Sequence, residues 1–359
     1  MASIGRVCIV APFPPRKGGV TVQTALLARY LADAGVEVVR VDTNLTCLRV
    51  RGLGWLRLAM QPLYIAIKLL ACIRRVAAVQ FQSCSYWGFM PAVVGVPIAR
   101  LFGKRSIISF MGGLGPEFLD KYSWIVKPIC RMATAVGVCS LELLNAFRER
   151  GVDVELLNNL YDAGLFSFRE RAQVEPVMVW TRSFQDVYDP LMAVKAFELV
   201  KAKHPEATLT MTSDGELTES VKRYIAQRGI TGVSLPGRVS TEEVARLMQE
   251  AGICLNTSKH DGFPTALLEA AGTGLAIVTT RVGGIPSVFR DGESAIMIEV
   301  GDSEAMARAV EDVLDDPVES LRCGRAARDA VRQYTWEHEW PKLQRYYGFV
   351  EEAPVAANR

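Results

Sequence analysis

The sequence has little of what marks a metal protein, a nucleic-acid binder or a disulfide-bonded domain. Three histidines occur in 359 residues, and the eight cysteines are scattered, with no Cys-x-x-Cys pair. No zinc-binding pattern is therefore present, and we expect no bound metal. Basic residues exceed acidic ones by a net charge of +2, which excludes the strong positive field of a nucleic-acid-binding domain. The cysteine usage fits a reducing, cytoplasmic compartment.

A long uninterrupted hydrophobic run is also missing. Residues 55–76 are apolar but are broken by Arg57, Gln61, Pro62 and Lys68 and by two arginines at 74 and 75. A membrane-spanning helix needs about 20 apolar residues with few charges, so we expect no span here. Two interpretations stay open, a core helix of the first domain or a basic amphipathic helix lying at a membrane surface.

What the sequence does contain is a repeated alternation of short Val- and Ile-rich runs with helical segments. Strand alternating with helix predicts parallel sheets covered on both faces. In the first part we expect strands at residues 6–10, 37–41, 77–81, 106–110, 135–139 and 154–157. We expect helices at 21–34, 55–75, 91–102, 125–134 and 141–150.

The same alternation begins again after a polar stretch near residues 168–175. Strands are expected at residues 177–180, 207–212, 233–235, 253–256, 276–279 and 295–298, and helices at 191–203, 217–228, 241–249, 265–271 and 303–314. The chain is too long for one core. We therefore predict an α/β protein with two doubly wound Rossmann-like domains, at residues 1–167 and 168–336, with a ligand cleft at the carboxyl edges of their sheets.

The most informative segment directly follows the predicted strand 253–256. Pro264 suits the first turn of a helix, so the amides of Thr265, Ala266 and Leu267 are expected to be free and to form an anion site with the helix dipole. Glu269, one turn further on, would accept hydrogen bonds from hydroxyl groups such as those of a ribose. Asp261, just before the helix, could do the same for a sugar.

This segment resembles the donor-site signature of family 4 glycosyltransferases, in which two acidic residues bracket a Gly-Phe pair and a helix start. Asp261 and Glu269 hold the family's spacing, although the family's usual first residue is Glu. The matching positions are Gly262, Phe263, Leu268, Ala270, Gly274, Gly283 and Gly284. The alternative is a helix capped by Asp261 with Glu269 solvated on its outer face.

A second match is Trp180-Thr-Arg182 at the end of the predicted strand 177–180, which resembles the family's Gly-Arg pair. Arg182 could form a two-pronged contact with a pyrophosphate and neutralise the charge that develops as it leaves. Many family members carry a Lys about six residues later, where this chain has Tyr188. The alternative for Arg182 is an ordinary surface charge.

Two glycine pairs lie in predicted loops of the first domain. Gly18 and Gly19 precede a helix beginning near Val20 and resemble the family's N-terminal glycine loop, where the backbone comes close to phosphate. Gly112 and Gly113 follow the strand 106–110, and Met111 stands where the family commonly has His. A plain turn is the alternative for the first pair, and the absence of Gly-x-Gly-x-x-Gly argues against a dehydrogenase.

The resemblance implies a GT-B fold with a C-terminal helix, residues 337–359, that crosses back to the first domain. It implies sugar transfer from a nucleotide-diphosphate sugar to an acceptor hydroxyl, with retention at the anomeric carbon and without a metal or other cofactor. Arg182, Asp261 and Glu269 are the expected catalytic residues. Gly18, Gly19, Gly112, Gly113, Gly262, Phe263, Pro264, Thr265, Ala266 and Leu267 are the expected substrate contacts.

Other functions remain open from the sequence. The acceptor could be a glycan, a lipid-linked molecule or a small molecule, and the protein could touch the inner face of the membrane peripherally. Met111 and Tyr188 leave room for an inactive GT-B protein that binds a nucleotide-sugar or glycan as a partner or regulator. A nucleotide-sugar epimerase of the same fold would be recognised by its product.

Overall fold

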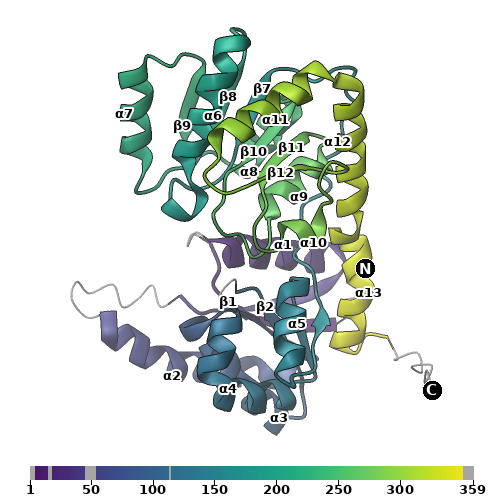
Figure 1. The fold of residues 1–359 in the computed structure, drawn as a ribbon. Coiled ribbons are helices and arrows are strands. Elements are labelled where there is room, and N and C mark those ends of the chain that lie inside the picture. The colour runs from purple at the N-terminus through teal and green to yellow at the C-terminus, as the bar shows by residue number, and fades with distance from the viewer. Residues whose placement is uncertain (1–4, 15–17, 45–53, 113–114, 351–359) are drawn as a thin grey trace. The chain divides into compact units, whose positions relative to one another are not determined.

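The computed structural model describes residues 5–14, 18–44, 54–112 and 115–350, except for the side chains of residues 54–59. Contacts divide the chain into two compact units. The first consists of Met1–Leu160 and Trp336–Arg359, and the second of Tyr161–Thr335. Each unit is built on its own sheet with helices on both faces (Figure 1).

The first unit contains a six-stranded sheet of order β2-β1-β3-β4-β5-β6, in which all paired strands are parallel. Its strands are β1 (Gly5–Ala11), β2 (Val36–Asp42), β3 (Ala78–Ser83), β4 (Arg105–Phe110), β5 (Ala135–Val138) and β6 (Glu155–Leu156). Its helices are α1 (Gly19–Asp33), α2 (Gly54–Cys72), α3 (Met90–Leu101), α4 (Gly115–Met132), α5 (Leu141–Glu149) and α13 (Trp336–Tyr347).

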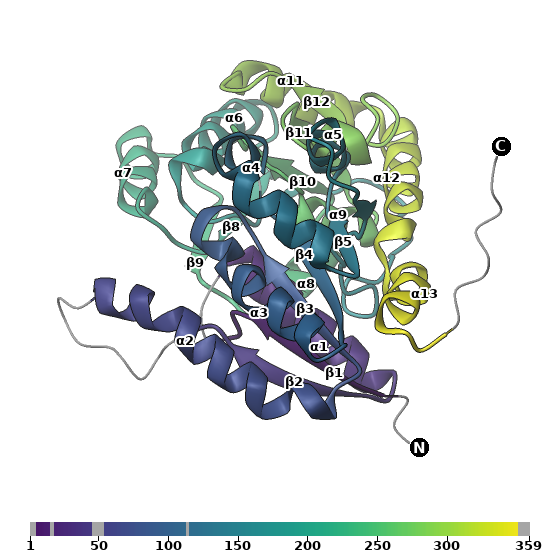
Figure 2. The ribbon, with the colours of Figure 1, turned by 90° about the horizontal axis from the view of Figure 1, so that it is seen from below.

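Alternate residues of β1 explain why this sheet is covered on both faces. Val7 and Ile9 pack with side chains of α1 and α13 in one buried cluster. Cys8 points to the other face, where its sulfur lies 3.9 Å from that of Cys72 at the end of α2. Figure 2 shows α2 running along the outside of this unit beside β2 and α3.

The second unit has a six-stranded parallel sheet of order β12-β11-β10-β7-β8-β9. Its strands are β7 (Val177–Trp180), β8 (Thr208–Thr212), β9 (Val233–Gly237), β10 (Ile253–Asn256), β11 (Ala276–Thr280) and β12 (Ile296–Ile298). Its helices are α6 (Pro190–Lys203), α7 (Thr218–Arg228), α8 (Thr241–Glu250), α9 (Thr265–Gly272), α10 (Ile285–Val288), α11 (Ser303–Asp315) and α12 (Pro317–Val331).

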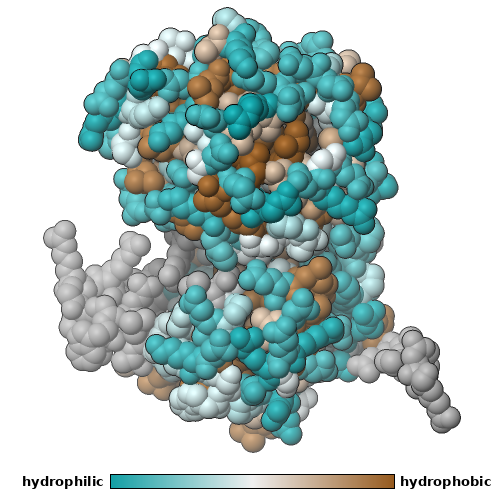
Figure 3. Space-filling view, in the orientation of Figure 1, coloured by the Kyte–Doolittle hydropathy of each residue, from teal (hydrophilic) through white to brown (hydrophobic). Residues whose placement is uncertain are grey.

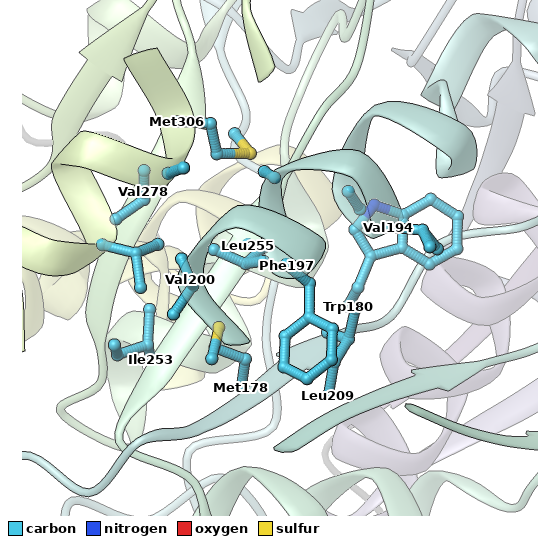
Figure 4. Close-up of a cluster of buried hydrophobic side chains, with 14 of the residues drawn as sticks. Met178, Trp180, Val194, Phe197, Val200, Leu209, Ile253, Leu255, Val278 and Met306 are labelled. Carbon is cyan, nitrogen blue, oxygen red and sulfur yellow. The ribbon is translucent and has the colours of Figure 1, made fainter. Parts of the chain in front are cut away.

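Two buried clusters lie on the opposite faces of this second sheet. On one face, Met178 and Ile253 of the sheet pack with Phe197 of α6 and Met306 of α11 (Figure 4). On the other face, Cys254 and its neighbours pack against α8, α9 and α12. The expected α/β fold with two parallel sheets is confirmed, and the carboxyl ends of β7 and β10 lie side by side at the centre of this sheet.

Several predicted bounds were wrong. Helix α4 begins at Gly115 and not at residue 125, with a non-helical bend at Tyr122. Helix α12 was not predicted. The N-cap residues of α8 and α11 are Ser240 and Asp302, each directly before the predicted first residue of its helix. Helix α13 ends at Tyr347 rather than at 359, and residues 351–359 lie outside the described part of the chain.

Candidate functional site

The second unit brings two predicted site residues together at the carboxyl ends of its central strands. Arg182 follows β7 and Asp261 follows β10, so the parallel pairing of these strands places both loops at one edge of the sheet. The Arg182 Nη2 donates to Asp261 Oδ2 over 2.8 Å. Their side chains are 15% and 6% exposed. This largely buried ion pair was not foreseen from the sequence, which assigned the two residues separate ligand contacts.

Tyr188 forms the second support of Arg182. It ends a short 3₁₀ turn, Asp186–Tyr188, and the Arg182 guanidinium carbon lies 4.1 Å from the centre of its ring. The turn is held by Thr257, whose hydroxyl donates to the Tyr188 carbonyl over 2.7 Å and accepts from the Trp180 indole over 2.9 Å. Tyr188, which stands where many family members have Lys, is thus the residue whose ring the Arg182 guanidinium contacts.

One nitrogen of Arg182 is left without a partner. Its Nε is buried and has no hydrogen-bond acceptor among the described residues, and the same is true of the neighbouring Thr181 hydroxyl. A buried charged donor without an acceptor is costly. The guanidinium therefore retains hydrogen-bonding capacity for an anionic ligand even while it is paired with Asp261.

Glu269 lies on α9 in surroundings that disfavour its charged form. Burial raises the pKa of its carboxyl to about 8, and Asp162 adds to the rise while Arg182 opposes it. Glu269 is only partly exposed, whereas the alternative assignment places it in solvent on an outer face of the helix. Without a ligand the carboxyl is mostly protonated near pH 7, and hydrogen-bond donors or added positive charge would favour its ionisation.

The raised pKa of Glu269 predicts a pH-dependent stability. Below about pH 4.5, its unperturbed value, the carboxyl is protonated in both the folded and the unfolded chain. Between there and about pH 8 the unfolded chain ionises while the folded one keeps its proton, so the free energy of unfolding falls. We expect wild-type protein to lose on the order of a few kcal/mol relative to Glu269→Gln over this range. Melting temperatures of both proteins from pH 4.5 to 9 measure this, and parallel curves would contradict it.

The start of α9 differs from the expectation in one respect. Pro264 is the residue before the helix, not its first residue. The amides of Thr265 and Leu267 are not free, because they donate to the carbonyls of Phe263 and Pro264 over 3.0 and 2.8 Å. Of the three expected amides, only that of Ala266 lacks an acceptor in the described structure.

The Gly-Phe pair and the later glycines shape the loop that carries Asp261. The amide of Gly284 donates to the Asp261 carbonyl over 2.9 Å. A Cβ at Gly283, whose φ is +51°, would lie 2.1 Å from that carbonyl oxygen, so only glycine fits. The ring of Phe263 packs edge-on against Tyr334, with centroids 5.4 Å apart. Phe263 and the two later glycines thus hold the loop in place, a packing function that the sequence did not reveal.

The glycine loops of the first unit have unequal surroundings. A Cβ would meet nothing within 4 Å at Gly18 or Gly19, and Gly18 has a φ of +146° at the start of α1. At Gly112 a Cβ would lie 2.7 Å from the Ser85 hydroxyl and 2.8 Å from its amide nitrogen. Gly112 is therefore needed for close packing. Gly113 lies outside the described residues.

Sequence reasoning missed a group of polar side chains at the end of β3. Gln82 Oε1, Ser83 Oγ and Ser85 Oγ are buried without a hydrogen-bond partner among the described residues. Tyr86, directly after them, has a φ of +57°, which is strained for a non-glycine residue. Polar residues at the carboxyl end of a parallel strand are a signal for a ligand site, and that signal was available in the sequence.

A cavity of about 250 Å³ lies elsewhere on the second unit, where Figure 3 shows hydrophobic surface. Ile277, Ile296 and Val313 form part of its lining, and none of the predicted site residues does. Within the described part of the chain no three His, Cys, Asp or Glu side chains are grouped so as to hold a metal. No helix of that part is long and apolar enough to cross a bilayer.

Comparison with known proteins gives a family match for the part of the chain that contains Arg182, Asp261 and Glu269. Residues 167–330 match the family described as glycosyl transferases group 1. A glycogen synthase of Mycobacterium tuberculosis is 25% identical over 64% of this chain and 55% of its own length. A sulfoquinovosyl transferase of Arabidopsis thaliana is 24% identical over 88% of this chain and 68% of its own. The chain thus spans little more than half of the first of these relatives.

Among solved structures, Anabaena HepE in complex with UDP-glucose is similar, with a TM-score of 0.73 and 14% identity. That comparison covers 96% of this chain and 100% of the other. At this identity the likeness concerns the fold alone. It is the fold that two Rossmann-like sheets already indicated. Residues 167–330 therefore match the glycosyl transferases group 1 family, and the chain has a GT-B fold and resembles family 4 glycosyltransferases.

Proposed function

We propose that this protein is a glycosyltransferase that moves a sugar from a nucleotide-diphosphate sugar to an acceptor hydroxyl. The observation that carries the proposal is the buried Arg182–Asp261 pair beside Glu269, at the carboxyl edge of the second sheet within the family-matched residues. Such an edge is where ligands bind in parallel α/β sheets. The similar protein HepE was solved with UDP-glucose, which makes a nucleotide-sugar the first donor class to try.

In this proposal Arg182 holds the pyrophosphate and stabilises the charge that builds on it as the sugar departs. Glu269 accepts the ribose hydroxyls, and Asp261 contacts the donor sugar once Arg182 turns toward phosphate. Transfer is retaining and needs no metal, since Arg182 supplies positive charge at the leaving group. Gly18, Gly19 and Gly112 are the proposed substrate contacts of the first unit. The location is the cytoplasm, and the acceptor is a glycan, a lipid-linked molecule or a small molecule.

A screen of nucleotide-sugars by thermal shift tests the proposed donor. A ligand at 100 times its dissociation constant should add about 2.7 kcal/mol of stability. Products are then analysed with and without glycan, lipid and small-molecule acceptors. Release of nucleotide with a new glycoside supports the proposal, whereas an epimer formed without acceptor would indicate an epimerase. Stabilisation with no turnover in any combination would instead favour an inactive protein that binds a nucleotide-sugar. The observation that supports this alternative is Tyr188, which stands where many family members carry a Lys.

Tyr188 is proposed as a positioning residue, because its ring supports the guanidinium of Arg182 at 4.1 Å. Tyr188→Phe keeps the ring and should leave the turnover number nearly unchanged. Tyr188→Ala should lower it about 5- to 30-fold, the equivalent of a cation–π contact of about 1 to 2 kcal/mol. Steady-state kinetics of both variants measure this split. Equal losses of turnover number in Tyr188→Phe and Tyr188→Ala would mean that the hydroxyl of Tyr188, and not its ring, supports catalysis.

A further inference from the structure

The first unit contains a segment of extreme charge asymmetry. No Asp or Glu occurs between Asp42 and Glu117, whereas nine Lys and Arg residues do. The net charge of the whole chain is only +2, so positive charge is concentrated in this part. The segment includes the strand β3 and the helices α2 and α3, which pack against each other.

Helix α2 turns an apolar stripe toward solvent. Met60, Leu63, Ile67 and Leu70 are 41%, 54%, 57% and 48% exposed. Their spacing of three, four and three residues places them on one side of the helix. Ile65 and Leu69 on the other side are fully buried. The core therefore accounts for one face of α2, and among the described residues the second apolar face has no partner.

Exposed basic residues lie on α2 and directly after it. Lys68 is exposed on α2, and Arg74 and Arg75 are exposed in the 3₁₀ turn that follows it. None of the three has a carboxylate partner among the described residues. Lys104 donates to the Arg74 carbonyl over 3.5 Å, which brings the end of α3 beside this turn. The last residue of α3, Leu101, is 82% exposed.

We propose that this surface, the α2 stripe with the cations beside it, docks the first unit on an anionic lipid bilayer. Apolar side chains enter the boundary between headgroups and acyl chains, while Lys68, Arg74 and Arg75 meet lipid phosphates. The absence of acidic residues in the segment removes the repulsion that an anionic surface would otherwise cause. The proposal names the surface that would make the peripheral membrane contact. Vesicle binding measures this contact without any need for sugar transfer.

The magnitudes fit reversible attachment. One Lys or Arg near an anionic leaflet is worth about five-fold in partitioning, so three give on the order of a hundred-fold. The half-exposed Leu and Ile side chains each add several-fold when they leave water. Charge screening should weaken the electrostatic part as salt rises.

Co-sedimentation of the full chain with phosphatidylcholine vesicles, with and without 40% or so of phosphatidylglycerol, tests the proposal. Wild-type protein should bind the anionic vesicles at least about ten-fold more tightly, and should be released by high salt. Leu63→Ser/Ile67→Ser should lose about ten-fold or more, and Lys68→Glu/Arg75→Glu a similar amount. Matched controls in the second unit are Leu199→Ser/Val318→Ser and Lys195→Glu/Arg223→Glu, which replace exposed residues of the same kinds and should bind like wild type.

Circular dichroism checks that every variant is folded. No binding to anionic vesicles at any salt concentration overturns the proposal, and so does equal loss in the test and control variants. A second copy of the chain is the other occupant that the stripe could take. A dimer in solution that Leu63→Ser/Ile67→Ser dissociates, without any effect on vesicle binding, would assign the surface to self-association and also overturn the proposal.

Discussion

Replacing Arg182 by Ala is expected to lower the turnover number about 100- to 1,000-fold, the cost of removing one preorganised charge from a developing anion. Donor affinity should fall much less, because charge on the pyrophosphate is greatest when the sugar departs. Arg182→Lys should restore little, since a point charge cannot reproduce the planar guanidinium, which lies over Tyr188 and donates to Asp261. Steady-state kinetics with the donor identified by thermal shift measure both parameters.

The Arg182 experiment needs a control for stability. Removing Arg182 leaves Asp261, which is 6% exposed, without its ion-pair partner, and breaking a buried pair can cost about 3 to 5 kcal/mol. Melting curves should therefore accompany the kinetics, with assays run well below the melting temperature of the variant. Arg246→Ala removes an exposed arginine from α8 and should leave catalysis unchanged. A loss confined to the Michaelis constant would show that Arg182 only docks the donor.

The course of the backbone was predictable where burial alone decides it. The strand β7 was predicted at its observed bounds, because a parallel strand buried on both faces is a continuous apolar run. Helix α12 was missed because its sequence is polar and contains Gly324, a poor helix former. The structure gives the reason for that glycine. A Cβ there would lie 2.7 Å from the carbonyl oxygen of Gly274, so the helix can approach only without a side chain.

The site was predictable as a set of residues but not as a set of contacts. Arg182 and Asp261 are far apart in the sequence, and their pairing depends on β7 and β10 being neighbours. The prediction of free amides at Thr265 and Leu267 assumed that Pro264 is the first residue of the helix. Pro264 is instead the residue before the helix, and both amides have acceptors. The contact of Tyr188 with Arg182 could not be predicted, because a short turn and the Thr257 hydrogen bond set the position of its ring.

Glu269 carries the second large expected effect. Glu269→Ala should weaken donor binding about 10- to 150-fold, because hydrogen bonds from ribose hydroxyls to a charged acceptor contribute about 1.5 to 3 kcal/mol. The pKa of about 8 in the ligand-free protein adds a pH dependence. If the carboxylate accepts from the ribose, the donor binds best to the ionised form, so affinity should rise with pH and level off above about pH 8. The positive charge of Arg182 favours this ionisation, but in the ligand-free protein burial favours the neutral form more strongly.

Isothermal titration of the donor between pH 6 and 9 shows whether the ionised or the protonated carboxyl of Glu269 contacts the donor. In wild-type protein the affinity should increase over this range, and in Glu269→Gln it should be weaker and nearly independent of pH. Glu293→Ala, which removes an exposed carboxylate of the second unit, is the matched control and should keep the wild-type curve. If Glu269→Ala binds the donor as tightly as wild type, the ribose assignment is wrong. If affinity instead falls as pH rises, the protonated carboxyl is the form that contacts the ligand, and it then acts as a hydrogen-bond donor.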